Sequence, residues 1–177
     1  SVRDNKNKLS DFHKKLGTLR FLDPACGCGN FLIITYRELR LLEFEVLRAL
    51  YNSGQRVIDV SSIILIDVDQ FYGIEYEEFP ARIAEVAMWL IDHQMNMLIS
   101  NELGQYFVRL PLKKAAQIHH ADALEANWES IVSKDELSYI IGNPPFIGSK
   151  IMSQFQRDSI VKELEGIQGA GVLDYVT

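Results

Sequence analysis

The chain has 177 residues, of which 47% are apolar and 24% are charged, and these values are typical of a single globular domain. Its net charge of −6 argues against a strong nucleic-acid-binding surface on this chain, because phosphate contacts require clustered Lys and Arg. The sequence lacks a run of about 18 apolar residues and begins with a polar segment, so neither a membrane span nor a signal peptide is expected. Cys26 and Cys28 are spaced poorly for a disulfide and are too few for a zinc site, which indicates a reducing, cytoplasmic compartment.

The first part of the chain predicts a strand followed by a long helix. Residues 19–22 form a short apolar run, and the glycine-rich sequence ACGCGN follows at 25–30. Apolar side chains then recur at steps of three and four as far as Leu50, which is the pattern of one helix face. Asn52-Ser53-Gly54 is expected to end this helix.

The middle of the chain predicts further strands and a second long helix. Residues 57–66 are rich in β-branched side chains and predict one or two strands. The sequence FYGIE at 71–75 predicts a short strand that ends in an acid. Pro80 suits the first turn of the next helix, which is expected to reach about Ser100.

The last part of the chain predicts two more strands, at 115–119 and 137–141. The second of these runs directly into the sequence NPPF at 143–146. Two consecutive prolines cannot lie inside a helix or a central strand, so a rigid turn is expected there. Residues 149–165 predict a helix, and residues 170–177 resemble the start of a further element.

The alternation of strands and helices predicts an α/β fold with a mostly parallel sheet flanked by helices. Such sheets bind ligands at the carboxyl ends of their strands. Four polar residues follow the predicted strands at these ends: Asp23, Glu75, Asp122 and Asn143. Their common position predicts a functional site.

The loop after Asp23 could bind a ligand or be a tight structural turn. Its glycines allow close approach of the backbone, and the following helix offers free N–H groups. A dinucleotide-binding loop would have a third glycine three residues after Gly29, but this position is Leu32. An acid before the loop suits a cation such as the amino group of S-adenosylmethionine (SAM) better than a pyrophosphate.

The two middle acids have both functional and structural interpretations. Glu75 could accept hydrogen bonds from both hydroxyls of a ribose, or it could be a solvated acid at a helix start. Asp122 could accept from an adenine amino group, or it could form an Asx turn or a helix cap. His119 and His120 are adjacent on a predicted strand and point to opposite faces, so no metal site is predicted.

The NPPF turn places two acceptors and an aromatic ring together. The Asn143 side chain and the Pro144 carbonyl could each accept one hydrogen of a planar NH₂ group. Phe146 could stack on the ring that carries this group. The turn would then align the nitrogen with an electrophile such as a sulfonium methyl, although a plain proline turn is the structural alternative.

Together, DPACGCGNF at 23–31 and NPPF at 143–146 resemble the first and catalytic motifs of SAM-dependent N6-adenine DNA methyltransferases. The combination of FLDPACGCGNFLI, RELRLLE, GIE, HADAL and IGNPPFIGSK is most similar to the methyltransferase domain of MmeI-like single-chain restriction–modification enzymes. The resemblance covers about residues 12–177. It implies a Rossmann-like class I methyltransferase fold and a double-stranded DNA substrate.

The resemblance also implies roles for individual residues. The implied cofactor-binding residues are Asp23, Ala25, Gly27 and Gly29 around the methionine part of SAM, Glu75 at the ribose, Tyr76 near the adenine, and Asp122 at the adenine amino group. The implied catalytic residues are Asn143, Pro144, Pro145 and Phe146, which would bind a target adenine flipped out of the duplex.

Departures from the family pattern indicate a partial domain, truncated at both ends. Cys28 replaces the usual small hydroxyl residue, and the motif that completes the methionine pocket is not recognisable before Asp23. Residues 1–177 are therefore assigned to a partial catalytic domain, with cofactor motifs at 19–125, the catalytic turn at 137–150 and the start of a further element at 170–177. The isolated chain is expected to be inactive, with most DNA contacts made by regions outside it.

Two other functions are compatible with the motifs. Protein glutamine and RNA guanine-N2 methyltransferases use the same NPP turn, although their first motif usually lacks the D-P-A-C opening. A non-catalytic SAM- or nucleotide-binding domain is the other alternative.

Overall fold

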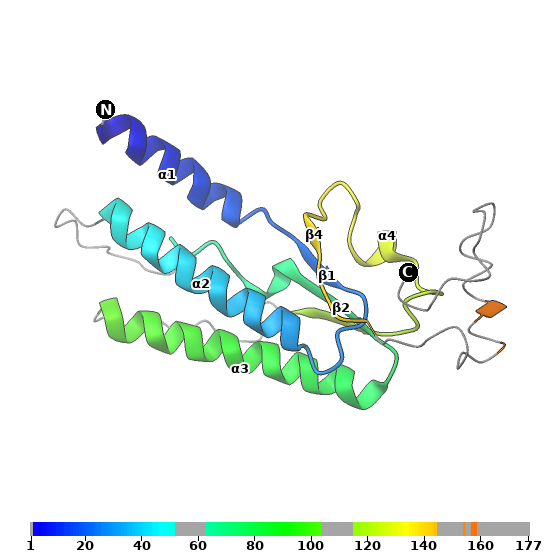
Figure 1. Ribbon diagram of the computed structural model, residues 1–177. Helices are drawn as coiled ribbons and strands as arrows, with labels where there is room; N and C mark the ends of the chain where they lie inside the picture. The colour runs from blue at the N-terminus through cyan, green and yellow to red at the C-terminus, as the bar shows by residue number, and fades with distance from the viewer. Residues whose placement is uncertain (1, 52–62, 104–114, 145–153, 155–156, 159–177) are drawn as a thin grey trace.

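The computed structural model describes residues 2–51, 63–103, 115–144, 154 and 157–158. Its elements in chain order are α1 (Val2–Leu16), β1 (Phe21–Asp23), α2 (Asn30–Tyr51), the 3-10 helix η2 (Val68–Gln70), β2 (Phe71–Glu75), α3 (Glu78–Leu103), β3 (Gln117–His120), α4 (Trp128–Ile131) and β4 (Tyr139–Ile140). Figure 1 shows that the strands lie beside the ends at which α2 and α3 begin. The N-termini of both helices therefore lie near the strands.

The four described strands form one parallel sheet in the order β3-β2-β1-β4. Phe21 of β1 lies opposite Phe71 of β2 and Tyr139 of β4, and its ring stacks on both neighbouring rings. The order places β1 between β2 and β4. The loops that follow these three strands therefore emerge side by side at one edge of the sheet.

The two faces of the sheet bury alternate residues of the strands β1 and β2. Phe21 and Phe71 belong to a large apolar cluster with residues of α2 and α3, including Met88. Leu22 and Ile74 point to the other face, where a smaller cluster includes the ring of Trp128 from α4. This alternation is the side-chain period of a β-strand, and it makes β1 and β2 apolar on both faces.

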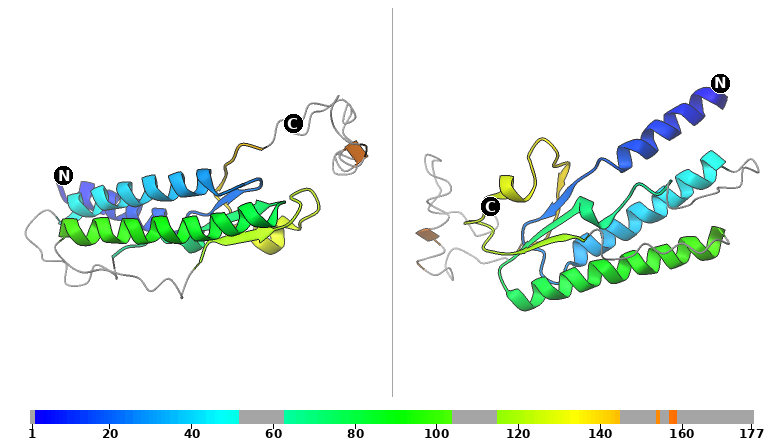
Figure 2. Two further views of the ribbon diagram at one scale, coloured as in Figure 1. Left: turned by 90° about the horizontal axis from the view of Figure 1, so that it is seen from below. Right: turned by 180° about the vertical axis from the view of Figure 1, so that it is seen from behind.

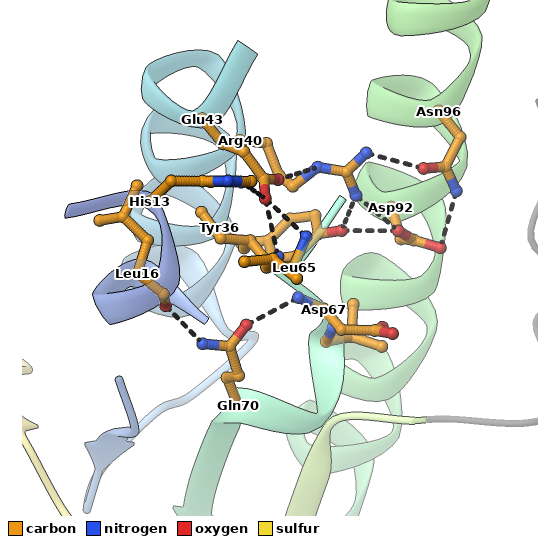
Figure 3. A network of polar contacts seen from close by, with 12 residues as sticks. His13, Leu16, Tyr36, Arg40, Glu43, Leu65, Asp67, Gln70, Asp92 and Asn96 are labelled. Atoms are coloured by element: carbon orange, nitrogen blue, oxygen red, sulfur yellow. Dashed lines mark hydrogen bonds and ion pairs between the residues drawn. The ribbon is translucent and has the colours of Figure 1, made fainter. Parts of the chain in front are cut away.

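A buried polar network joins α2 to α3 (Figure 3). The Arg40 side chain is fully buried, and its Nη2 donates to Asn96 Oδ1 at 2.9 Å, while its Nη1 donates to Asp92 Oδ1 at 3.2 Å and to the Tyr36 hydroxyl. The Tyr36 hydroxyl donates to Asp92 Oδ1 at 2.6 Å. Because a charge buried without partners is very costly, this network determines how the two helices pair.

A second set of buried contacts joins α1 and η2 to the helical layer. The ring Nε2 of His13 lies 3.0 Å from Glu43 Oε1, so α1 is bonded to α2. Gln70 of η2 donates from Nε2 to the carbonyl oxygens of Leu16 and Leu19, each at 2.9 Å. These bonds fix the end of α1 and the segment that leads into β1. Figure 2 shows α1 beside α2 from two further directions.

Most predicted elements are confirmed. The strands expected at 19–22, 71–75, 115–119 and 137–141 correspond to β1, β2, β3 and β4, and the two long helices correspond to α2 and α3. Within the expected helix at 149–165, residues 154 and 157–158 are helical, and the others lie outside the described residues, as do residues 170–177. The helices α1 and α4 were not predicted.

The strand predicted within 57–66 is wrong for its described part, residues 63–66, which form a turn and irregular backbone. The backbone N–H groups of Leu65 and Ile66 donate to Glu43 Oε1 at 2.6 and 3.2 Å. A buried carboxylate of α2 therefore occupies donors that a strand would use for pairing. Residues 57–62 lie outside the described residues.

Candidate active site

Asp23, the last residue of β1, has a buried side chain that is only 1% exposed. Its Oδ1 accepts a hydrogen bond from the Ala25 N–H at 3.1 Å, which turns the chain sharply after the strand. Within the described residues, no ion pair joins this carboxylate to a Lys or Arg. Burial, together with the nearby charge of Glu75, raises the pKa of Asp23 to about 6, despite the opposing bond from Ala25.

The loop after Asp23 uses glycine at two positions that have left-handed backbone. Gly27 has φ +53° and Gly29 has φ +81°, a region that other residues rarely adopt. A Cβ on Gly29 would lie 3.1 Å from the Cβ of Ala84, so the loop packs closely on α3. The N–H of Gly29 donates to the Cys26 carbonyl at 2.8 Å, and α2 begins at the next residue.

The end of β2 is bonded directly to this glycine loop. The Gly27 N–H donates to Glu75 Oε2 at 2.8 Å, and the Cys26 N–H donates to the Ile74 carbonyl at 3.0 Å. Gly73 leaves space for the loop, because a Cβ there would lie 2.8 Å from the Cys26 Sγ. Burial, with a contribution from the charges of Asp23 and Glu75, raises the pKa of the Cys26 thiol to about 12.

The turn after β4 lies against the buried carboxylate of β1. The Ile141 N–H donates to the Leu22 carbonyl at 2.9 Å, which continues the pairing of β4 with β1. A Cβ on Gly142 would lie 2.5 Å from Asp23 Oδ1, so the backbone before Asn143 passes directly over this acid. Asn143 itself is exposed. The structure therefore places the start of the NPPF turn beside the glycine loop.

The remaining predicted site residues differ in their exposure and in their contacts. Tyr76 directly follows Glu75 and is 67% exposed, and Ala25 is half-buried in the glycine loop. Asp122 accepts the Leu124 N–H at Oδ1 at 2.9 Å, which is the Asx turn considered as its structural alternative. Pro144 is half-buried, whereas Pro145 and Phe146 lie outside the described residues.

Gly142 is a site residue that the sequence patterns did not single out. It stands between a strand and Asn143, but its role depends on an approach to Asp23 that no local pattern contains. A glycine directly before a polar strand-end residue was the only available signal. Within the described ranges, no group of three or more His, Cys, Asp or Glu residues could hold a metal ion, and no helix is long and apolar enough to cross a membrane.

The geometry combines a glycine loop, two carboxylates and an Asn-Pro turn at one edge of a parallel sheet. The family model described as the MmeI DNA-methyltransferase domain matches residues 1–177. The chain belongs to the MmeI DNA-methyltransferase domain family. Its fold is accordingly the α/β, Rossmann-like methyltransferase fold expected from the motifs.

Two relatives illustrate this membership. A solved structure of the type IIL restriction–modification enzyme MmeI in complex with DNA is 54% identical, with a TM-score of 0.90 over 99% of this chain and 23% of that chain. DNA methyltransferase A of Bacillus subtilis (strain 168) is 36% identical over 98% of this chain. The chain covers 20% of the length of that relative.

Proposed function

We propose that this domain transfers a methyl group from SAM to N6 of an adenine flipped out of double-stranded DNA, within a restriction–modification protein. One observation carries the proposal. The backbone at Gly142, immediately before Asn143, lies against the buried Asp23 carboxylate at the start of the glycine loop. This contact supports the proposal, because it would bring the cofactor side and the substrate side of one site together, as direct transfer between two bound molecules requires.

The residues on the cofactor side fit SAM. The carboxylates of Asp23 and Glu75 lie close enough for the charge of Glu75 to raise the pKa of Asp23, and the described residues pair neither of them with a Lys or Arg. A cationic ligand would stabilise both acids, and SAM carries an ammonium and a sulfonium group. When bound, SAM supplies an electrophilic methyl group. Glu75 and Asp122 would hold its ribose and adenine amino group, and Tyr76 would pack near the adenine.

The residues on the substrate side fit an aromatic amine. The amide oxygen of Asn143 and the carbonyl of Pro144 would accept the two hydrogens of the adenine NH₂ group and orient its nitrogen. Pro145 would keep the turn rigid, and Phe146 would stack on the base. Adenine N6 is hydrogen-bonded inside the duplex, so the base must be flipped before it can reach this turn.

Because the chain is acidic, the proposal requires that other parts of a longer protein supply the DNA-binding surface. Its net charge of −6 is unfavourable for phosphate contacts, and the relatives are several times longer. The MmeI structure is that of a complex with DNA, which supports DNA as the substrate of the proposed longer protein. A cytoplasmic location would accord with this substrate.

The proposal is tested in the full-length protein that contains this domain. Purified enzyme is incubated with SAM labelled at the methyl group and with duplex DNA, total protein or RNA in separate reactions. We expect label in DNA, and N6-methyladenine after digestion of that DNA to nucleosides. Label in protein or RNA but not in DNA would support one of the other amino-group methyltransferases instead.

The role of the turn is tested with Asn143→Ala in the same protein. Removal of the amide should abolish methylation, because the target nitrogen loses an orienting acceptor, while calorimetric SAM affinity stays within about twofold. The exposed Asn127, which caps α4, offers a control of the same residue type. Full methylation by Asn143→Ala would contradict the assignment of this residue.

A further inference from the structure

Glu75 is hydrogen-bonded to all three loops that surround the cofactor side of the site. Its Oε2 accepts from the Gly27 N–H of the β1 loop at 2.8 Å, and its Oε1 accepts from the Glu77 N–H of the β2 loop at 2.9 Å. Its backbone carbonyl accepts from the Ala121 N–H of the β3 loop at 2.9 Å. One residue therefore connects segments that are far apart in the sequence.

Gly27 is the residue of the glycine loop whose N–H makes this connection. Glycine adopts positive and negative φ about equally readily, so intrinsic preference does not fix the left-handed backbone of Gly27, φ +53°. Among the residues that the structure describes, none has an atom within 4 Å of a Cβ placed on Gly27, apart from its chain neighbours, so their packing does not hold this side of the residue. The bond to Glu75 spans 48 positions of sequence, and its acceptor is an ionisable carboxylate, which makes it stronger than an ordinary backbone bond.

We propose that Glu75 is a positioning residue, which holds the glycine loop in its ligand-binding conformation before any cofactor arrives. This role is separate from contact with the ribose. Each carboxylate oxygen has two lone pairs, so an oxygen that accepts a backbone N–H retains a place for a ribose hydroxyl. The loop role rests on the hydrogen bonds alone, whereas the simultaneous ribose contact rests on the proposed function.

The first experiment measures the loop without cofactor. Hydrogen–deuterium exchange of the cofactor-free, full-length protein is followed at the Gly27 and Glu77 amides by mass spectrometry with fragmentation to single residues. Glu75→Gln leaves one acceptor oxygen for the N–H groups of Gly27 and Glu77, so we expect exchange at one of these two amides to accelerate by about tenfold, the equivalent of one lost hydrogen bond. Glu75→Asp keeps the charge but shortens the side chain, and it should accelerate exchange similarly.

Glu77→Gln is the matched control. It makes the same change of charge two residues away, and the Glu77 backbone N–H that bonds to Glu75 is unaltered. Exchange at Gly27 should remain at the wild-type rate in this variant. The midpoint of thermal unfolding should be similar in all variants, which separates local release of the loop from general loss of stability. Unchanged exchange in both Glu75 variants would overturn the proposal.

The second experiment separates loop positioning from ribose contact. Affinities for SAM and for its analogue without the 2′ and 3′ hydroxyls are measured by calorimetry in wild type and Glu75→Asp, which keeps the negative charge beside the cationic ligand. A residue that only binds the ribose would leave affinity for the analogue unchanged on substitution. Loop positioning predicts that the analogue also binds about tenfold more weakly to the variant.

The two experiments distinguish failure of this proposal from failure of the proposed function. If neither SAM nor the analogue binds wild-type protein, the proposed cofactor is wrong, and the exchange measurement still decides the loop role. If SAM binds but the analogue is insensitive to Glu75→Asp, the positioning role is overturned and the proposed function stands.

Discussion

Gly142 and Asp23 are in direct contact across the β1–β4 pair, with no space for a side chain between them. A Cβ on Gly142 would lie 2.5 Å from Asp23 Oδ1, which is closer than real Cβ atoms approach, and 3.1 Å from its Cγ, which is tighter than most real Cβ contacts. The contact joins the acid before the glycine loop to the residue before the Asn-Pro turn. Any displacement of one residue is therefore transmitted to the other.

Gly142→Ala should reduce methylation by about 100-fold, because the turn or the acid must shift and small misplacements of reacting groups are costly. It should also destabilise the protein by about 1–3 kcal/mol through overpacking. Methylation rates and urea unfolding of the full-length protein measure the two effects.

Asp23→Ala supplies the control for this contact. In an Asp23→Ala background the added methyl group meets a smaller side chain, so the stability cost of Gly142→Ala should decrease, and the double mutant should lose less stability than the sum of the two single mutants. If Gly142→Ala costs the same stability with Asp23 or Ala at position 23, the added methyl group is accommodated by a shift that does not involve Asp23.

Asp23→Asn should stabilise the cofactor-free protein at pH 7.5 and have little effect at pH 4. Burial raises the folded-state pKa of Asp23 from 3.8 to about 6, so the folded protein retains a proton that the unfolded chain has lost between these values. Folding is consequently favoured below this range, and the ionised acid opposes folding well above pH 6 by on the order of 3 kcal/mol. Thermal unfolding at both pH values measures the difference.

Affinity for SAM should also depend on pH through the Asp23 carboxylate, but in the opposite direction from folding stability. Wild-type affinity should fall as pH decreases through about 6, because a protonated Asp23 no longer attracts a cation. Asp23→Asn should bind SAM weakly at all pH values and lose this dependence. A wild-type affinity that is constant from pH 5 to 7.5 would argue against Asp23 as a cofactor ligand.

Arg40→Ala should destabilise the protein by about 3–5 kcal/mol, because it leaves the buried carboxylates of Glu43 and Asp92 without their cation. Arg37→Ala is the matched control on the same helix. Arg37 is exposed and pairs with the exposed Glu38, so its loss should cost less than about 1 kcal/mol. Similar costs for both substitutions in urea unfolding would show that the buried network contributes little to stability.

Gly29→Ala should weaken SAM binding more than Gly27→Ala does. Both residues have left-handed backbone, which costs an alanine roughly 1–2 kcal/mol. Only at Gly29 would the new methyl group also meet α3, 3.1 Å from the Cβ of Ala84. Calorimetric affinities and unfolding midpoints are compared between Gly27→Ala, which has backbone strain alone, and Gly29→Ala, which has strain and the contact with α3. Equal affinities would exclude a role for the packing of Gly29 on α3 in SAM binding.

The local patterns of the sequence determined the strands, the two long helices and the location of the candidate site. Apolar periodicity marks α2 and α3, and the residues that end β1, β2 and β4 meet because parallel strands share a carboxyl edge. The glycine loop was also evident, because left-handed backbone requires glycine at defined positions after a strand. The helices and the glycine loop depend on interactions between residues that are near in sequence, whereas the meeting of the strand ends follows from the general geometry of parallel sheets.

The tertiary structure alone decided which polar groups are buried and what they contact. Residues 63–66 have the composition of a strand, yet Glu43 takes up the N–H groups of Leu65 and Ile66. Arg40 lies within a helix of ordinary pattern, yet it is fully buried between Asp92 and Asn96. Each of these contacts joins positions more than 20 apart, and their energies depend on burial, which a local pattern does not contain. The contact of Asp23 with Gly142 has the same origin, because it exists only once β4 lies beside β1. The raised pKa of Asp23 likewise depends on burial in the folded chain and on Glu75 of the neighbouring strand β2.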